Sequence, residues 1–379
     1  MKTIRDIKHF EGVRILVRVD FNVPIKNDII VDDMRIRAVL ATIDFLRSRN
    51  AKIILISHLE SINGENLSLE PISKSLDRLN IPNIFIKDYK RVNDYIEHEM
   101  KDGECILLEN LRFFAGEKDN NKKLAKELAS LGDIFVNEAF SVSHREHASI
   151  IGIPKLLPSY VGLQFEKEVL NLSRAFNPSH PFLFVLGGAK FETKLPLLKK
   201  FMNIADMVFV GGALASDFFK AKGYEVGKSK ISDGKFNISQ FVNNSKLLLP
   251  IDVVNKSGEI KPAENLSSSD KIMDTGPRTL EMLKEKIATA KFILWNGPLG
   301  LYEDGFRDST LELAKMIGEA TMRGTETIVG GGDTLAAIKA SSIQNGFTFI
   351  SMGGGAMLEF LAKGTLPGIE ALEDSAKNN

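Results

Sequence analysis

One segment of the chain, residues 327–338, constrains its fold more than any other. It consists of a short β-branched run, three consecutive glycines, and Asp-Thr at the start of an alanine-rich helical pattern. Glycines expose backbone N–H groups, and a helix N-terminus adds the positive end of its dipole, so this order of elements suits a bound phosphate. Asp333 adds a carboxylate able to hold a magnesium ion that bridges such phosphates. The same pattern is equally typical of a tight strand-to-helix turn, so the segment alone leaves both interpretations open.

The second half of the chain repeats this order of apolar strand, glycines and helix three more times, at 182–194, 207–215 and 349–356. Neither the P-loop pattern nor the dinucleotide-binding fingerprint occurs in these segments. Four such units together favour a backbone surface shaped around a nucleotide. Lys190 and Lys194 lie four residues apart and therefore on one helix face, where they are able to contact a phosphate chain or to form an exposed amphipathic surface.

A fifth strand and loop span residues 292–303. The Gly-Pro-Leu-Gly run in this segment is expected to form either a flat apolar wall for a base or a turn that only packs. Glu303, at its end, is a candidate acceptor for ribose hydroxyls. Trp295 is interpreted as a core residue.

The first half of the chain also alternates strands and helices, but here charged residues follow the strands. The predicted strands are 14–19, 52–56, 104–108 and 134–137. The predicted helices are 34–47, 69–79 and 121–129. This alternation predicts a parallel sheet with right-handed crossovers, and such sheets bind ligands beyond the carboxyl ends of their strands.

The residues at these strand ends, or at the start of the first helix, are mostly polar or basic: Asp20, Asn22, Arg35, Arg37, His58, Arg112, His144, Arg145 and His147. Several arginines at one edge of a sheet predict a small ligand with several negative charges, because a guanidinium binds carboxylate and phosphate bidentately. The three histidines match no zinc-binding spacing, and they suit an anion site or a structural role equally well.

The bulk properties predict a two-domain protein of the cytoplasm. A chain of 379 residues exceeds the usual size of a single core. Lys plus Arg and Asp plus Glu balance at 49 each, so no global field points to nucleic acid or a membrane. The single cysteine, Cys105, lies in an apolar run and suits a reducing compartment. The chain starts without an apolar signal segment, and no run reaches the roughly 20 apolar residues of a membrane span.

Nine short segments match phosphoglycerate kinases in the same order along nearly the whole chain. They are RVDFNVP (18–24), SHL (57–59), LENLRF (108–113), NEAF (137–140), HREH (144–147), LGGAK (186–190), WNGP (295–298), GGGDT (330–334) and GGGA (353–356). The chain therefore resembles the phosphoglycerate kinase family, and so many ordered matches are far more specific than any single motif.

The resemblance implies an α/β fold of two Rossmann-like, three-layer α/β/α domains with parallel sheets, joined by a helical hinge. Residues 1–160 are expected to form an N-terminal domain that binds 3-phosphoglycerate, and 161–181 a connecting helix and hinge. Residues 182–363 are expected to form a nucleotide-binding domain. Residues 364–379 are expected to form a tail that returns to the first domain.

The implied reaction is phosphoryl transfer between 1,3-bisphosphoglycerate and ADP, giving 3-phosphoglycerate and ATP in glycolysis or gluconeogenesis, by domain closure. The acceptor carboxylate and the β-phosphate of ADP are already ionised at neutral pH, so the chemistry needs charge neutralisation and positioning rather than a strong general base. We also expect a monomer, with small-molecule substrates and without a nucleic-acid or membrane partner.

The resemblance also implies roles for individual residues. Substrate binding is expected of Asp20, Phe21, Asn22, Arg35, His58, Arg112 and Arg145. Nucleotide binding is expected of Lys194, Gly211, Gly212, Glu303, Gly331, Gly332, Asp333 and Thr334. Arg35 and Lys190 are expected to stabilise charge during transfer, and Asp333 to bind the Mg²⁺ that accompanies ATP or ADP.

The chain departs from the family pattern at three places. Glu60-Ser61-Ile62 replaces a typical Gly-Arg-Pro, Ser141-Val142 replaces Gly-Thr, and Ala213 replaces a third glycine. The loss of a guanidinium at Ser61 removes a charge-assisted contact of about 1.5–3 kcal/mol if it is buried. We therefore expect weakened or differently arranged phosphate anchoring. Two alternatives are a kinase for a related small carboxylate and a catalytically degenerate nucleotide-binding relative.

Overall fold

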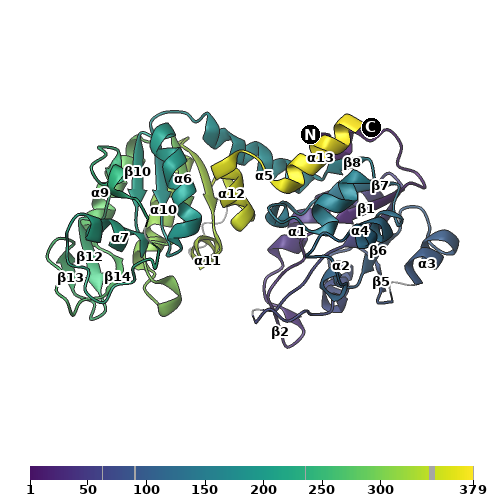
Figure 1. Cartoon of the computed structure of the whole chain (residues 1–379), viewed down its shortest axis with the longest axis horizontal. Helices are drawn as coiled ribbons and strands as arrows, with labels where there is room; N and C mark the ends of the chain where they lie inside the picture. Colours follow the sequence, from purple (N-terminus) through teal and green to yellow (C-terminus); the bar gives the residue numbers. More distant parts are fainter. Residues whose placement is uncertain (62, 89–90, 235, 341–345, 379) are drawn as a thin grey trace. The chain divides into compact units, whose positions relative to one another are not determined.

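The computed structural model describes residues 1–61, 63–88, 91–234, 236–340 and 346–378. These residues form two compact units: Met1–Leu170 together with Lys363–Asn379, and Asn171–Ala362. Each unit contains a six-stranded sheet flanked by helices (Figure 1), and every neighbouring pair of strands in these two sheets is parallel. The predicted α/β class with parallel sheets is thereby confirmed. The change of unit falls within helix α5 (Leu163–Ser173), inside the predicted connector.

The sheet of the first unit has the strand order β5-β6-β4-β1-β7-β8. Its strands are β1 (Arg14–Arg18), β4 (Lys52–Ile56), β5 (Ile84–Ile86), β6 (Cys105–Leu108), β7 (Ile134–Asn137) and β8 (Ser159–Val161), with a hairpin of β2 (Ile25–Lys26) and β3 (Ile29–Ile30) beside them. Its helices are α1 (Met34–Arg47), α2 (Glu70–Arg78), α3 (Val92–His98), α4 (Lys122–Ala129) and α13 (Pro367–Asn378). The central strands are mostly apolar and buried, as expected for a parallel sheet that is covered by helices.

Short helical turns connect these elements. In the first unit they are η1 (Ile4–Asp6), η3 (Leu111–Phe113), η4 (Phe140–Val142), η5 (Ala148–Gly152) and η6 (Ile153–Lys155). In the second unit they are η7 (Arg174–Phe176) and η8 (Tyr302–Asp304). Turns η3 and η4 follow β6 and β7, so they lie at the carboxyl edge of the first sheet.

The sheet of the second unit has the strand order β11-β10-β9-β15-β16-β17. Its strands are β9 (Phe182–Leu186), β10 (Met207–Val210), β11 (Leu247–Leu248), β15 (Phe292–Asn296), β16 (Glu326–Gly330) and β17 (Phe349–Ser351). Its helices are α6 (Phe191–Ile204), α7 (Leu214–Ala221), α8 (Ser239–Val242), α9 (Pro277–Thr289), α10 (Asp308–Met322), α11 (Gly332–Ala340) and α12 (Gly355–Lys363). A separate antiparallel sheet, which the sequence did not predict, consists of β12 (Asp252–Asn255), β13 (Ile260–Pro262) and β14 (Ile272–Thr275).

Helix α13 brings the end of the chain onto the first unit, beside β8 (Figure 1). Leu366 and Leu372 are buried there. The backbone N–H of Gly368 donates to the carbonyl of Ser143 at 2.8 Å, and the Ser375 hydroxyl donates to the carbonyl of Leu157 at 3.0 Å. The last residues of the chain therefore complete the core of the unit that its first residues begin.

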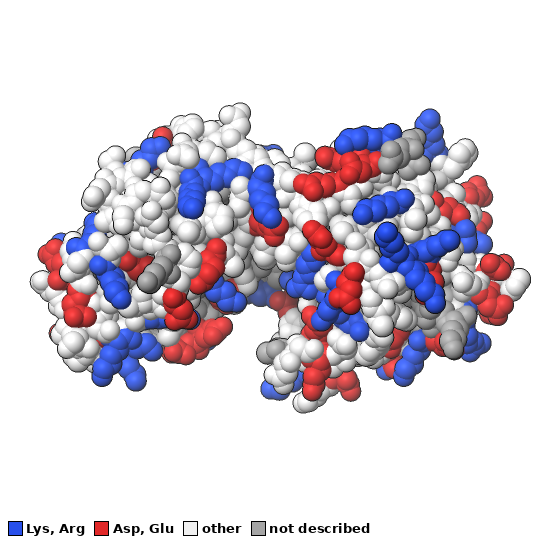
Figure 2. Space-filling view, in the orientation of Figure 1, with Lys and Arg blue, Asp and Glu red and all other residues white. Residues whose placement is uncertain are grey.

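Basic and acidic side chains are interspersed over the face shown in Figure 2, as the balanced composition leads one to expect. Within the described part of the chain, none of the helices combines the length and the apolar character needed to cross a bilayer.

Candidate active site

The carboxyl ends of four neighbouring strands of the first unit, β6, β4, β1 and β7, bring the predicted anion-site residues together. After β1, the buried Asp20 carboxylate accepts hydrogen bonds from Arg35 Nη1 at 2.8 Å, from the backbone N–H of Asn22 at 3.0 Å, and from the Ser141 hydroxyl. Burial alone would raise the pKa of Asp20, but the charge of Arg35 and the hydrogen bond from Ser141 hold it below its ordinary value. Asp20 therefore stays ionised and fixes the Arg35 guanidinium, which remains about one-third exposed.

His58, after β4, has a defined tautomer. Its ring is buried, and its Nδ1 lies 3.2 Å from Nη2 of Arg18. Burial and the charge of Arg18 lower the pKa of His58 well below its ordinary value, so the imidazole is neutral. Because a guanidinium only donates, Nδ1 accepts and the ring proton lies on Nε2. Nε2 has no hydrogen-bond partner among the described residues, so it is a donor available to an anion.

Arg18 holds this histidine in place, and sequence reasoning did not assign it to the site. Its side chain is fully buried in β1, and its Nε donates to the Ser149 hydroxyl at 2.9 Å. Ser149 in turn donates to the buried carboxylate of Glu117 at 2.6 Å. Burial lowers the pKa of Arg18 to about 10, so its charge persists at neutral pH. The available signal was an arginine inside an apolar strand, where a charge needs a specific partner.

Arg112, in η3 after β6, is the second buried arginine of the edge. Its Nε donates to Oε1 of Glu60 at 2.9 Å, and its Nη1 lies 3.3 Å from Nδ1 of His147. Its Nη2 has no hydrogen-bond partner in the described part of the chain. Burial together with the charges of Arg112 and Arg145 lowers the pKa of His147 to about 3, so this ring is also neutral and accepts from Arg112.

Arg145 and Phe21 complete the predicted set in different ways. Arg145 follows β7 and is half-buried, and its charge helps to lower the pKa of both His58 and His147. No side-chain hydrogen bond or ion pair of Arg145 occurs among the residues that the structure describes. The Phe21 ring, in contrast, is buried in the core, and only its backbone N–H faces the edge, where it donates to the Ser57 hydroxyl at 2.9 Å.

In the second unit, three glycine loops pack backbone against backbone. A Cβ on Gly187 would lie 2.2 Å from the carbonyl oxygen of Pro298, and one on Gly212 would lie 2.7 Å from the backbone nitrogen of Gly188. Gly212 also has φ +61°, a conformation that favours glycine. Gly211 is restricted as well, because a Cβ there would lie 2.8 Å from the ring of Phe209. These glycines are therefore required by the packing of the fold itself.

The loop between β16 and α11 is different. Gly331 has φ +111° and directly follows the strand, but Gly332 has ordinary backbone angles and open space where a Cβ would lie. Gly332 and Asp333 are exposed in the first turn of α11. Thr334 points inward, and its hydroxyl accepts a hydrogen bond from the backbone N–H of Gly297 at 2.9 Å. The exposed loop thus presents backbone N–H groups and one carboxylate at a helix N-terminus.

The two lysines expected to contact phosphate, Lys190 and Lys194, have different surroundings. Lys190 lies at the N-terminus of helix α6 and is exposed. Lys194 is buried, and its ammonium donates to Oδ1 of Asn296, whose amide donates to the carbonyl of Gly330 at 2.9 Å. Burial lowers the pKa of Lys194 to about 8, and the negative charge of Asp333 opposes this. Lys194 therefore belongs to the glycine loop rather than to an exposed helix face.

A cavity of about 90 Å³ lies beside the same loops. Its walls include Gly212 and Ala213 on one side and Leu299 and Gly300 on the other, with Lys230 and Lys271 also lining it. The Gly-Pro-Leu-Gly run thus contributes to a largely apolar wall, and Ala213 lies in the opposite wall. Glu303 is exposed in η8, just after this run.

Asp333 is the carboxylate nearest in sequence to the glycine loop. The described residues contain no group of three or more His, Cys, Asp or Glu side chains arranged to hold a metal ion. Magnesium that accompanies a nucleotide does not need such a group, because one or two carboxylates, the phosphates and water complete its coordination. A single exposed carboxylate in the first turn of a helix therefore fits a magnesium–nucleotide complex.

Comparisons with known proteins agree along nearly the whole chain. A family model described as phosphoglycerate kinase matches residues 4–364. The chain is 41% identical over 399 residues to the phosphoglycerate kinase of Dictyoglomus turgidum, which covers 98% of this chain and 99% of the relative. It is also 41% identical over 397 residues to that of Chlorobium phaeobacteroides, with the same coverage.

Solved structures of phosphoglycerate kinases are similar as well. The enzyme from Coxiella burnetii has a TM-score of 0.86 and 34% identity, and the match covers 98% of each chain. The enzyme from Pyrococcus horikoshii has a TM-score of 0.86 and 31% identity, and the match covers 100% of each chain.

Proposed function

The chain belongs to the phosphoglycerate kinase family, and from that premise we propose how its own residues divide the work of the reaction. The reaction is phosphoryl transfer between 1,3-bisphosphoglycerate and ADP, giving 3-phosphoglycerate and ATP, a step of glycolysis. A match over nearly the whole chain does not favour the two alternatives, a kinase for another carboxylate and a degenerate relative.

We propose that the carboxyl edge of the first sheet binds 3-phosphoglycerate. The observation that carries this proposal is a pair of buried donors, His58 Nε2 and Arg112 Nη2, that have no partner among the described residues. An unpaired buried donor costs about 1–3 kcal/mol, and an anionic ligand would offset that cost. Asn22, Arg35 and Arg145 supply further donors and positive charge at the same edge, with Asp20 holding Arg35 in place.

We propose that the glycine loop and α11 bind the phosphates of ATP or ADP. Gly332 supports this, because neither its backbone angles nor its neighbours require a glycine. Gly331, Gly332 and the backbone of Thr334 would offer N–H donors, and Lys194 a buried positive charge. The cavity between the Gly212 and Leu299 walls would receive the base, with Glu303 as the acceptor for ribose hydroxyls. Asp333 would hold Mg²⁺, which neutralises phosphate charge when it is bound.

The chemistry asks for charge neutralisation at the transferring phosphoryl group. We assign this to Arg35 and Lys190. Arg35 is fixed by Asp20 yet partly exposed, so its remaining N–H groups are available to a substrate. Lys190 is exposed at the N-terminus of α6, the helix that contains Lys194. Domain closure, a cytoplasmic location and a monomeric state remain predictions; gel filtration with light scattering would measure the last of these.

A coupled assay that follows ADP formation from Mg-ATP tests the proposal. The wild type should form ADP in the presence of 3-phosphoglycerate far faster than in its absence. Lys190→Ala should lower kcat by about 100-fold or more, the usual effect of removing one group that stabilises transition-state charge. Lys199→Ala, at an exposed position of the same helix, is the matched control and should leave kcat unchanged.

Two outcomes would contradict the proposal at different levels. A wild-type rate that does not depend on 3-phosphoglycerate would contradict the substrate. Equal rates for Lys190→Ala and Lys199→Ala would contradict only the role given to Lys190.

A further inference from the structure

The carboxylate of Glu60 contacts the Arg112 guanidinium, which the proposed function assigns to the substrate. This carboxylate accepts from Arg112 Nε at 2.9 Å and lies 3.1 Å from Nζ of Lys118. Burial opposes ionisation of Glu60, but Lys118 and Arg112 lower its pKa below the ordinary value. A negative charge held between two cations is already present where an anionic ligand is expected.

Because Arg112 is buried, its contact with Glu60 affects how a ligand reaches the guanidinium. The Arg112 side chain is 0% exposed, so an external anion reaches the guanidinium only after a covering group moves. Among the described residues, Glu60 is the carboxylate that contacts it, and Glu60 keeps 21% of its own side chain exposed. Of the groups around Arg112, this partly exposed carboxylate is therefore the one that an incoming anion can replace charge for charge.

The loop that carries Glu60 is anchored by its backbone rather than by this carboxylate. The N–H of Glu60 donates to Oδ1 of Asn22 at 3.0 Å, and Glu60 pairs with Asn66 as an isolated antiparallel bridge. Asn66 in turn donates from its side chain to the carbonyl of Arg112 at 3.2 Å. The carboxylate of Glu60 is thus free to rotate away while the loop remains in place.

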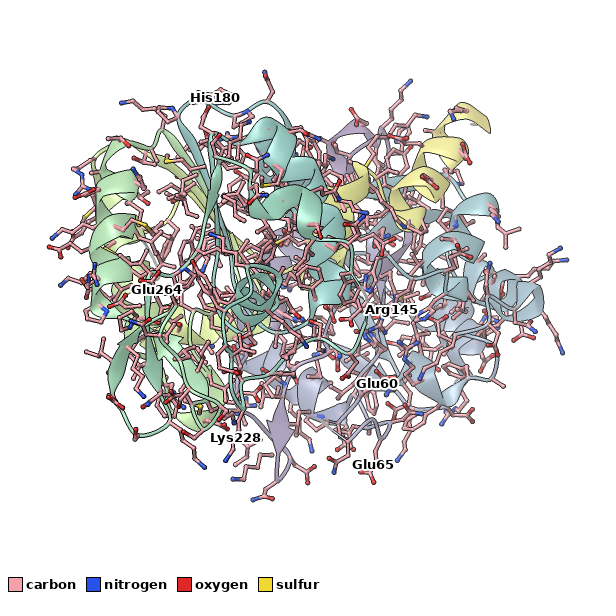
Figure 3. All side chains as sticks on the ribbon, turned by 60° about the vertical axis from the view of Figure 1, so that its left-hand side comes forward. Glu60, Glu65, Arg145, His180, Lys228 and Glu264 are labelled. Carbon is pink, nitrogen blue, oxygen red and sulfur yellow. The ribbon has the colours of Figure 1, made fainter. Side chains whose placement is uncertain are left out.

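Lys118 is the second cation on this carboxylate, and its side chain is 63% exposed. An exposed ion pair is worth about 0–1 kcal/mol, so Lys118 exchanges one anion for another at little cost. Its contact is with Glu60, and the next residue along the chain, Ser61, stands at the position where the family typically has an arginine. Figure 3 labels Glu60 and Arg145 in the first unit, together with Glu65, the exposed acidic residue at the other end of the loop.

We propose that Glu60 is an internal counter-anion that the phosphate of 3-phosphoglycerate displaces from Arg112, and that Lys118 then becomes a ligand of that phosphate. Glu60 is thereby a residue that sets substrate affinity, and Lys118 supplies the cation missing at Ser61. This inference rests on the proposed substrate site.

Glu60→Gln tests the displacement. Glutamine keeps the size of the side chain and an acceptor for Arg112 but removes the competing charge. The KM for 3-phosphoglycerate should fall roughly three- to tenfold, with kcat and the KM for ATP within about twofold of wild type. Binding of 3-phosphoglycerate without nucleotide, measured by calorimetry, should tighten by the same factor. Glu65→Gln makes the same charge change on the same loop without the contact, and should have no effect.

Lys118→Gln tests the second part of the proposal in two backgrounds. It should raise the KM for 3-phosphoglycerate in the wild type, and by a larger factor in Glu60→Gln, where Lys118 is not held by the carboxylate. Lys122→Gln, at a nearby exposed lysine, is the matched control. Thermal unfolding of each variant identifies any loss of folding, which would otherwise resemble a loss of affinity.

The possible results separate this inference from the proposed function. If wild-type turnover does not depend on 3-phosphoglycerate, the substrate site itself is wrong. If turnover depends on it but Glu60→Gln leaves the KM unchanged or raises it, the displacement is wrong while the site remains. If Lys118→Gln has no effect in either background, Lys118 is not a phosphate ligand.

Discussion

At the scale of single residues, Lys194 shows how burial changes what a charge can do. Its ammonium is bonded to Asn296, and burial brings its pKa down to about 8. The lysine is therefore mostly charged at pH 7 and mostly neutral at pH 9. If a phosphate site uses this charge, its affinity for phosphate has to fall between pH 7 and pH 9.

We predict that the affinity for ADP falls between pH 7 and pH 9. With a pKa of about 8, roughly one-tenth of Lys194 is charged at pH 9, so the dissociation constant should rise by up to about tenfold. Calorimetric titration of Mg-ADP at pH 7 and at pH 9 measures this dissociation constant. Lys194→Gln should bind weakly at both pH values, and an equally steep pH dependence in that variant would show that another group is responsible.

Individual contacts were the least predictable part of the site. The order of motifs identified Asp20, His58 and Arg112, and the start of the first predicted helix gave Arg35. The structure brings all four to one sheet edge. The motifs could not show that the side chains of Phe21 and Thr334 point inward, because a sequence motif does not fix side-chain direction. The roles of Arg18, Glu117 and Lys118 were missed, since their contacts join residues far apart in the chain. Ile62, part of the divergent loop, lies outside the described residues.

At the scale of elements, the glycines of the second unit separate into two groups. Gly187 is required where two backbones touch, whereas Gly332 faces open space. Glycine-rich segments of similar sequence therefore have different roles, and only the structure distinguishes a packing glycine from one that leaves space for a ligand.

We predict opposite effects for alanine at these two positions. Gly187→Ala forces a methyl group against the Pro298 carbonyl and should destabilise the second unit by about 1–3 kcal/mol or more. Gly332→Ala should leave the unfolding free energy within about 0.5 kcal/mol of wild type but weaken ADP binding about tenfold or more. Chemical denaturation and calorimetry measure the two quantities. Unchanged ADP binding in Gly332→Ala would contradict the phosphate cradle.

The buried carboxylate of Glu138 lies at the N-terminus of helix α5, and its pKa is near neutrality. Glu138 accepts from the backbone N–H groups of Gln164 and Phe165, both at 3.0 Å, and from the Thr42 hydroxyl. Burial nevertheless raises its pKa to about 7. The folded protein therefore keeps a proton that the unfolded chain releases at its ordinary pKa of 4.5.

We predict that this proton makes the effect of Glu138→Gln depend on pH. The stabilisation from proton uptake is fully present below pH 4.5 and is lost as the pH rises through about 7. Glutamine cannot take up the proton, so the loss of melting temperature relative to wild type should be larger at pH 5 than at pH 8. Thermal unfolding of both proteins at pH 5 and pH 8 measures this loss. A difference in melting temperature that is larger at pH 8 than at pH 5 would contradict the raised pKa.

Most elements were predictable because their signals are local. Apolar runs of four or five residues gave the main strands of both sheets, and the predicted helix 34–47 coincides with α1. The β12–β13–β14 sheet was missed because its strands are short, polar in places and paired across loops. Parallel order within each sheet followed from the alternation of strands and helices, but the strand order itself needed the structure.

At the scale of the whole molecule, the chain starts and ends in the same unit. Residues Met1–Leu170 are completed by Lys363–Asn379, which carry helix α13. Family resemblance predicted a returning tail, which composition and periodicity alone did not indicate. Which unit such a helix packs on depends on contacts more than 200 residues apart, such as that between Ser375 and Leu157.

We predict that Leu372→Ala weakens the first unit and leaves the second intact. Leu372 is 2% exposed on α13, and truncating a buried leucine costs about 2–5 kcal/mol. The variant should lose affinity for 3-phosphoglycerate on warming earlier than wild type, with ADP affinity unchanged. Glu370→Ala, at an exposed position of α13, is the control. Equal weakening of both ligands would show that the units unfold together.

The return of α13 also sets an order for protein synthesis. A ribosome releases the chain from its N-terminus, and domains fold as they emerge. The nascent first unit lacks Leu366 and Leu372 until the last residues are made, while every residue of Asn171–Ala362 has already been joined. The unit whose translation begins first is therefore the last to have its core complete.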